Sequence, residues 1–212
     1  MMHQYLVELS ALMAIFAFVI IAPGADTAMV IRQALVHGRR SSVLTSLGIG
    51  TSLLFHVGYT ILGLGLIISQ SVLMFNVIKW LGAAYLIYLG IQSFRTGKVE
   101  FSVRAEASDK AVQGMMKAFS LGFLANALNP KPVLFFLSVF STVVSVETPS
   151  AVKLGYGAVM ASCLIAWFVS VSLFLTMPAM RAGFEKASKW INRASGAVFI
   201  VFGLKLATER AG

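Results

Sequence analysis

Long apolar stretches are the feature that most constrains how this chain folds. The longest run over residues 43–69, 72–94 and 151–177, and a further one covers 190–208. A helix rises about 1.5 Å per residue, so each can cross a hydrocarbon core of roughly 30 Å. Charged residues are only 12% of the chain, and the mean hydropathy is +0.85. A soluble domain carries about twice that charged fraction, so we expect an all-α membrane protein forming one transmembrane domain over residues 1–212.

Two further apolar regions, residues 5–36 and 115–146, are too long for a straight span. As one helix, each would be about 48 Å long. Both contain residues that interrupt a helix, because proline lacks an amide hydrogen and glycine loosens the backbone. We therefore expect six transmembrane helices, of which the first and fourth are interrupted. The interruptions are Ala22-Pro23-Gly24-Ala25-Asp26 and Asn129-Pro130-Lys131-Pro132.

The two interruptions indicate an internal repeat. Pro23 and Pro130 are 107 residues apart in a chain whose half-length is 106. Residues 48–50 and 155–157 correspond at the same offset as Gly-X-Gly, and residues 82–90 match 195–203 six positions further along. Three spans per repeat is an odd number, so the second copy must be inverted, as in many secondary transporters. The predicted division is a repeat at about 1–94, a cytoplasmic linker at 95–118 and a repeat at about 115–212; coincidence of composition is the alternative.

The basic residues predict the orientation. Alternate loops hold 12 of the 17 Lys and Arg residues, and the other loops hold 4. Because the side richer in Lys and Arg is normally cytoplasmic, both termini are expected outside the cytoplasm. The net charge of +9 is thereby explained by topology, and nucleic acid is not expected as a partner. The first group comprises Arg32, Arg39, Arg40, Arg95, Lys98, Arg104, Lys110, Lys117, Arg181, Lys186, Lys189 and Arg193; the second comprises Lys79, Lys153, Lys205 and Arg210.

Asp26 and Lys131 lie in the two interruptions and are the main candidate functional residues. Asp26 is interpreted as the only acid inside a predicted span, where a carboxylate costs at least a few kcal/mol unless it has a partner or a function. The alternatives are that Asp26 caps the restarted helix, or that the two charges form a structural ion pair. The functional hypothesis is a site for a small zwitterion. Its ammonium would meet Asp26 and carbonyls freed near Pro23 and Gly24, and its carboxylate would meet Lys131 and half-helix N-termini.

Three other polar residues are predicted near this site. Asn129 can cap a helix that starts at Pro130, and Asn126 shares its face at spacing i, i+3; both are candidate substrate contacts or interhelical hydrogen bonds. His56, inside the second span, is either a proton relay or a histidine bonded to a neighbouring helix. No nucleotide-binding loop, catalytic triad or set of metal ligands is recognisable, so neither an enzyme nor a bound cofactor or metal is expected.

Taken together, the motifs Pro23-Gly24-Ala25-Asp26, Gly38-Arg39-Arg40, Gly48-Ile49-Gly50 and Asn129-Pro130-Lys131-Pro132-Val133-Leu134-Phe135-Phe136 resemble the LysE/RhtB family of amino-acid exporters over nearly the whole chain. Family members usually have a second proline where this chain has Ala25. The resemblance implies a multi-pass protein of the bacterial cytoplasmic (inner) membrane that exports amino acids using the proton gradient. Residues 138–141 and 187–191 resemble the threonine and homoserine branch.

The predicted function is therefore proton antiport of small neutral amino acids out of the cytoplasm, since Asp26 and Lys131 cancel and leave no acid for a dibasic side chain. The expected partners are the amino acid, a proton, the lipid bilayer and a second copy of the chain. A cation or metal-ion exporter, with Asp26, Asn126 and Asn129 as oxygen ligands, is the first alternative, although hard cations usually need several carboxylates. A membrane chaperone or channel component is the second, but it would not require two interrupted helices.

Overall fold

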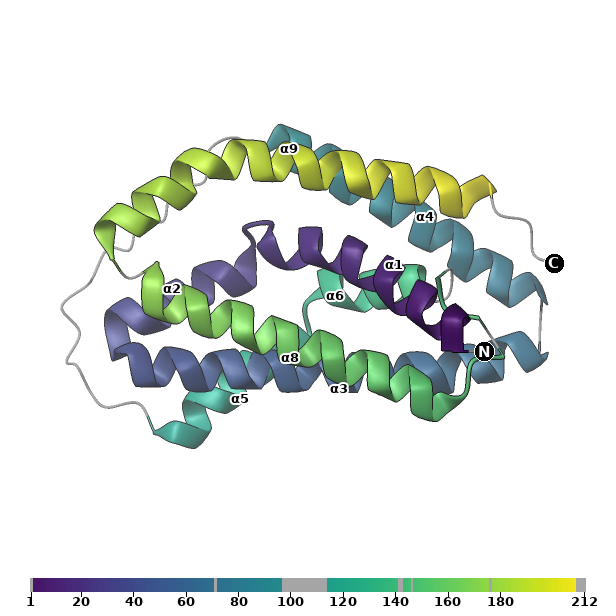
Figure 1. The fold of residues 1–212 in the computed structure, drawn as a ribbon, viewed down its shortest axis with the longest axis horizontal. Coiled ribbons are helices and arrows are strands. Elements are labelled where there is room, and N and C mark those ends of the chain that lie inside the picture. The colour runs from purple at the N-terminus through teal and green to yellow at the C-terminus, as the bar shows by residue number, and fades with distance from the viewer. Residues whose placement is uncertain are drawn as a thin grey trace.

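The computed structural model is entirely helical in regular structure over the residues it describes, which are 2–70, 72–96, 114–140, 143–145, 147–175 and 177–208. The helices lie roughly along one long axis, and the start of α1 and the end of α9 are at the same end of the molecule (Figure 1). In chain order they are α1 (Met2–Ile21), α2 (Ala25–His37), α3 (Arg39–Gln70), α4 (Val72–Arg95), α5 (Met115–Ala127), α6 (Pro130–Phe135), the π-helical segment η1 (Phe136–Phe140), α8 (Ser150–Phe174) and α9 (Pro178–Thr208).

Both predicted helix interruptions are present. The first lies between the end of α1 at Ile21 and the start of α2 at Ala25, with Gly24 in an extended conformation at φ −156°. At the second, α5 and the helix that follows it are bent by 54° relative to each other. Asn129 caps α6 as predicted, because its side-chain oxygen accepts a hydrogen bond from the Lys131 amide at 3.0 Å, and Pro130 follows at the first helical position.

Five segments of the described chain are long and apolar enough to be membrane spans. Four are single helices, namely α1, residues Arg39–Gly63 of α3, α8 and α9, and the bent pair at the second interruption forms a fifth. The protein is therefore an all-α, multi-pass membrane protein. Most of the predicted 95–118 linker lies outside the described residues, and its last residues, from Met115, belong to α5.

Several helices pack closely at glycine residues. α3 packs mainly on α5 and α8, and α4 packs on α9. A methyl group added to Gly48 would collide with the Phe119 carbonyl oxygen of α5, and one on Gly50 would overlap Ile165 of α8. Glycine is thus required at both positions for the helices to approach. By contrast, a methyl group on Gly155 would face open space, whereas one on Gly157 would overlap Val57 of α3.

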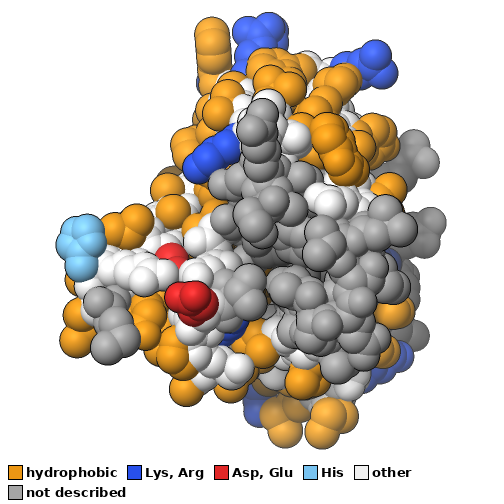
Figure 2. Space-filling model, turned by 90° about the vertical axis from the view of Figure 1, so that its right-hand side faces the viewer, with side chains coloured by type: hydrophobic (Ala, Val, Ile, Leu, Met, Phe, Trp, Pro, Cys, Tyr) orange, Lys and Arg blue, Asp and Glu red, His pale blue; other side chains and the backbone are white. Residues whose placement is uncertain are grey.

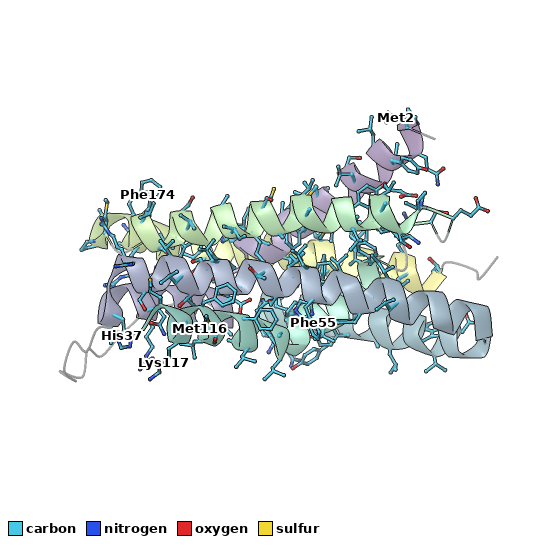
Figure 3. The ribbon with its side chains drawn as sticks, turned by 90° about the horizontal axis from the view of Figure 1, so that it is seen from below. Met2, His37, Phe55, Met116, Lys117 and Phe174 are labelled. Atoms are coloured by element: carbon cyan, nitrogen blue, oxygen red, sulfur yellow. The ribbon has the colours of Figure 1, made fainter. Side chains whose placement is uncertain are left out.

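Basic residues gather at the end of the molecule opposite the start of α1. His37 and Lys117 lie at that end, and Met2 lies at the other (Figure 3). The turn from α2 to α3 and the starts of α5 and α9 also lie toward that end (Figure 1). This agrees with the grouping predicted from the loops, except that Lys98, Arg104 and Lys110 are outside the described residues.

At the end that carries the start of α1, acidic side chains are visible among polar and apolar ones, and Lys or Arg side chains lie above and below them (Figure 2). The structure also shows that one interpretation of the sequence, concerning the acids inside the spans, was wrong. Asp26 is not the only acid inside a span, because Glu8 lies within α1 and is only 6% exposed. The interpretation failed because Glu8 is close to the N-terminus, where an acid is easily assigned to the membrane surface, whereas α1 begins at Met2 and carries Glu8 on its buried face.

Candidate functional site

A small cavity lies where the two helix interruptions meet. Its volume is about 50 Å³, which is enough for only a few water molecules. Its walls come from α1, α2, α3, α5, α6, η1 and α8, so both halves of the chain contribute. The apolar wall includes Phe16, Phe135, Phe136 and Phe168, and the polar lining consists of Asp26, Thr27, His56, Asn126, Asn129 and Lys131.

Asp26 lies in the first turn of α2 and is held by a residue from the other interrupted helix. Asn126, in the last turn of α5 and 3% exposed, donates from Nδ2 to Oδ2 of Asp26 at 2.8 Å. The capping hypothesis for Asp26 is not supported, because the residue at the cap position is Gly24 and no side chain caps α2. The carboxylate is therefore positioned by a contact between the two halves.

Asn126 also links Asp26 to a polar face of α3. Since its amide nitrogen donates to Asp26, its Oδ1 accepts hydrogen bonds from Ser52 and from Nε2 of His56, the latter at 3.2 Å. In the neutral imidazole, Nδ1 then accepts from the Tyr59 hydroxyl at 2.9 Å. An amide in this arrangement does not carry a proton from Asp26 to His56. The contacts therefore favour a positioning role for His56, and the relay remains a prediction.

His56 is completely buried, whereas its neighbour Phe55, near the middle of α3 in Figure 3, is 55% exposed. The imidazole stacks on Phe136 of η1, with ring centroids 5.8 Å apart and an angle of 11° between the planes. The π-helical turn η1 follows directly on α6, and such turns are frequent at functional sites. It brings an aromatic ring against the one titratable side chain that α3 places on the cavity.

Lys131 reaches the first interruption from the second. Its Nζ lies 3.5 Å from the Val19 carbonyl oxygen near the end of α1, and it would be 3.6 Å from a methyl group on Gly24. Lys131 and Asp26 line the same cavity, but the two side chains form no direct ion pair. The hypothesis that they only neutralise each other through direct contact is therefore not supported. The Asp26 carboxylate and the Lys131 ammonium are therefore separate from each other in the cavity lining.

The other predicted site residues flank the cavity. Gly24 and Asn129 line it, whereas Pro23 and Pro130 lie in the backbone that sets the two interruptions. Sequence reasoning missed Ser52 and Tyr59, which bond to Asn126 and His56. The available signal was their spacing from His56, four and three residues away, which places the three side chains on one face of a helix.

The described residues contain no group of three or more His, Cys, Asp or Glu side chains that could hold a metal ion. One acid, Asp26, and one lysine, Lys131, line the cavity instead. Interrupted helices around such groups are typical of one class of membrane protein, the secondary transporters.

Comparisons with known proteins agree with this class and identify the family. The chain belongs to the LysE family, since the model of the LysE type translocator matches residues 17–210. It is 31% identical over 191 residues to the threonine efflux protein of Escherichia coli K12, covering 90% of this chain and 93% of the relative. It is 28% identical over 194 residues to the homoserine/homoserine lactone efflux protein of Salmonella typhimurium LT2, covering 90% and 91%.

A third relative is the uncharacterized membrane protein YrhP of Bacillus subtilis 168, which is 32% identical over 208 residues, with 93% of this chain and 97% of the relative covered. No solved structure matches. The resemblance predicted from the motifs, including its threonine and homoserine branch, is thereby confirmed.

Proposed function

We propose that this protein exports small neutral amino acids of the threonine and homoserine type from the bacterial cytoplasm in exchange for protons. The names of the two efflux proteins described above support the substrate class. The observation that carries the proposal is the cavity itself, which is lined by one carboxylate and one ammonium group that form no direct ion pair. A zwitterion carries the complementary pair of charges, whereas a dibasic amino acid would bring a positive charge for which the lining offers no second acid.

In the proposed complex, the substrate ammonium binds Asp26 and its carboxylate binds Lys131. The short side chain of threonine or homoserine lies against the apolar wall that includes Phe16 and Phe168. A cavity of about 50 Å³ must widen to accept an amino acid. Binding therefore requires the two interrupted helices to separate, which is the kind of motion that alternating access needs.

Proton exchange follows from the two states of Asp26. The ionised carboxylate attracts the substrate ammonium, and the protonated carboxyl group does not. Substrate and proton therefore compete for Asp26. If the emptied site turns back to the cytoplasm only when Asp26 is protonated, each exported amino acid is exchanged for a proton. The hydrogen bond from Asn126 keeps Asp26 directed into the cavity between these events.

The proposed architecture is six spans in two inverted repeats, with α1 to α4 in the first and α5 to α9 in the second. Reciprocal packing of α4 and α9 supports it. A methyl group on Gly90 would collide with Gly196 and Ile200, and one on Gly203 would collide with Ala83 and Ile87. All three residues in each set correspond at an offset of 113 residues, so the two contacts are related as a two-fold axis requires.

We place the protein in the inner membrane. Its basic end faces the cytoplasm, and both ends of the chain lie outside the cytoplasm. The clustering of Arg39 and Arg40 with Lys117 and Arg181 at one end of the helices supports it (Figures 1 and 3). A homodimer remains a prediction.

Transport into everted membrane vesicles tests the function. With the vesicle interior made acidic, radiolabelled threonine should accumulate, and collapse of the pH gradient should stop accumulation. Lysine should accumulate much less, and Mn²⁺ not at all. Lysine uptake equal to that of threonine would contradict the neutral substrate, and threonine uptake unaffected by the gradient would contradict proton exchange.

A further inference from the structure

Glu8 forms a buried hydrogen-bonded cluster that is separate from the cavity. Its carboxylate accepts hydrogen bonds from the Thr148 hydroxyl at 3.0 Å, the Tyr156 hydroxyl at 3.0 Å, the Ser145 amide at 3.2 Å and Nε2 of Gln4 at 3.2 Å. Thr148 lies within 3.0 Å of both carboxylate oxygens. Each of these groups donates to Glu8, as an ionised carboxylate requires.

The cluster joins the two halves of the chain. Glu8 and Gln4 belong to α1, Ser145 and Thr148 precede α8, and Tyr156 lies in the second turn of α8. The N-terminal end of α8 favours a negative charge nearby. Among the described residues, the charged or titratable groups that act on Glu8 are Lys153 and Tyr156 of α8. The Tyr156 hydroxyl also lies 3.1 Å from the Tyr5 carbonyl oxygen, so its one proton is shared between that oxygen and Glu8.

The same face of α1 connects this cluster to the cavity. Glu8, Leu12 and Phe16 are all buried and recur every four residues, so they form one stripe along the helix. Phe16 lines the cavity, and Glu8 lies two turns nearer to the end where α1 begins. Moving the first part of α1 away from α8 would open that stripe, and it would also break the Glu8 hydrogen bonds.

We propose that Glu8 is a second proton-binding site, which closes the outer side of the cavity when ionised and opens it when protonated from outside. An external proton forms an O–H bond on the carboxylate and removes its charge, so Thr148 and Tyr156 lose their ionised acceptor. α1 then separates from α8, and the substrate leaves. This proposal rests on the proposed export function. It adds that the proton that drives export binds Glu8 before it reaches Asp26.

Cysteine labelling tests the outer lock directly, because Cys163 is the only cysteine of the chain. Leu12→Cys is introduced together with Cys163→Ser, and a membrane-impermeant maleimide is applied to right-side-out and inside-out vesicles. Leu12 is completely buried, so its replacement should react slowly while Glu8 is ionised. Adding Glu8→Gln should raise the external labelling rate by about tenfold or more, since hydrogen bonds to a charged group are lost. The matched control is Glu147→Gln, which changes an exposed acid close to Thr148 and should leave the rate unchanged.

Unchanged labelling in the Glu8→Gln variant would overturn the proposal, as would faster labelling only in inside-out vesicles. Labelling that speeds up on lowering the external pH with Glu8 present, but not with Glu8→Gln, would support it. The readout needs no transported substrate. A chain that fails to export threonine but shows the predicted labelling would contradict the export function and leave the lock intact, so the two failures are distinguishable. Folding of each variant is checked by its level in the membrane and by its elution in detergent.

Discussion

The two acids of the first interrupted helix, Asp26 and Glu8, have opposite surroundings. Glu8 is surrounded by donors, with hydrogen bonds from four groups in α1, α8 and the segment before α8. Asp26 has hydrogen bonds from the side chains of Asn126 and Asn129 of the second interruption, and it lines a cavity. A carboxylate that is fully hydrogen-bonded stabilises the conformation that contains it, whereas one with unused acceptor capacity can bind a ligand.

This difference suggests a different function for each acid, substrate binding for Asp26 and closure for Glu8. Asp26 has the geometry of a group that binds first one cation and then another. Glu8 has the geometry of a lock, because its partners are spread over segments that must part if α1 moves. In the proposed mechanism, a buried carboxylate therefore binds the substrate at Asp26 and holds the outer side closed at Glu8.

The largest effect should come from Asp26→Asn, which keeps an oxygen but removes the charge and the titratable proton. We expect the export rate to fall by about tenfold to a hundredfold, which corresponds to the loss of a hydrogen bond to a charged group. Asp26→Ala should fail equally, and both variants should reach the membrane at normal levels. Transport assays on matched amounts of protein measure this, with Glu147→Gln as the control. Near-normal export by Asp26→Asn would remove the distinction between the two acids.

Lys131→Met sharpens the same comparison when it is combined with Asp26→Asn. Each single change leaves one buried charge without its opposite, and the double change leaves none, so the double variant should recover stability lost in either single variant. Thermal unfolding in detergent measures this recovery. Export should remain absent in the double variant, and recovery of export would show that transport needs neither charge.

A smaller effect is expected from Thr148→Val, which removes one donor from Glu8 while keeping the size of the side chain. The free energy of unfolding should fall by about 1–3 kcal/mol, because a buried carboxylate loses part of its hydrogen bonding. Thr51→Val is the control, since Thr51 is exposed and bonds only the Leu47 carbonyl in its own helix. Equal melting temperatures for the two variants would show that the Glu8 cluster is not a structural lock.

The sequence predicted the local features of this fold better than its contacts. Proline, glycine and asparagine act on their own backbone, so the two interruptions and the Asn129 cap could be placed from residues alone. The convergence of Asp26, Asn126 and Lys131 on one cavity followed from the repeat and the motifs. The bridging role of Asn126 could not be foreseen, because it depends on how α5 is rotated against α2 and α3. Glu8 was missed for a related reason, since only the packing of α1 on α8 shows that it is buried.

The most direct test of the central claim asks whether the protein recognises both charges of its substrate. Exchange of radiolabelled threonine is measured in proteoliposomes that contain the purified protein, with threonine, its methyl ester or N-acetylthreonine as competitor. The ester lacks the carboxylate that would meet Lys131, and the N-acetyl compound lacks the ammonium that would meet Asp26. Competition by intact threonine alone is the predicted result. Equal competition by both derivatives would show that the cavity between the two helix interruptions does not bind a zwitterion through its acid and its base.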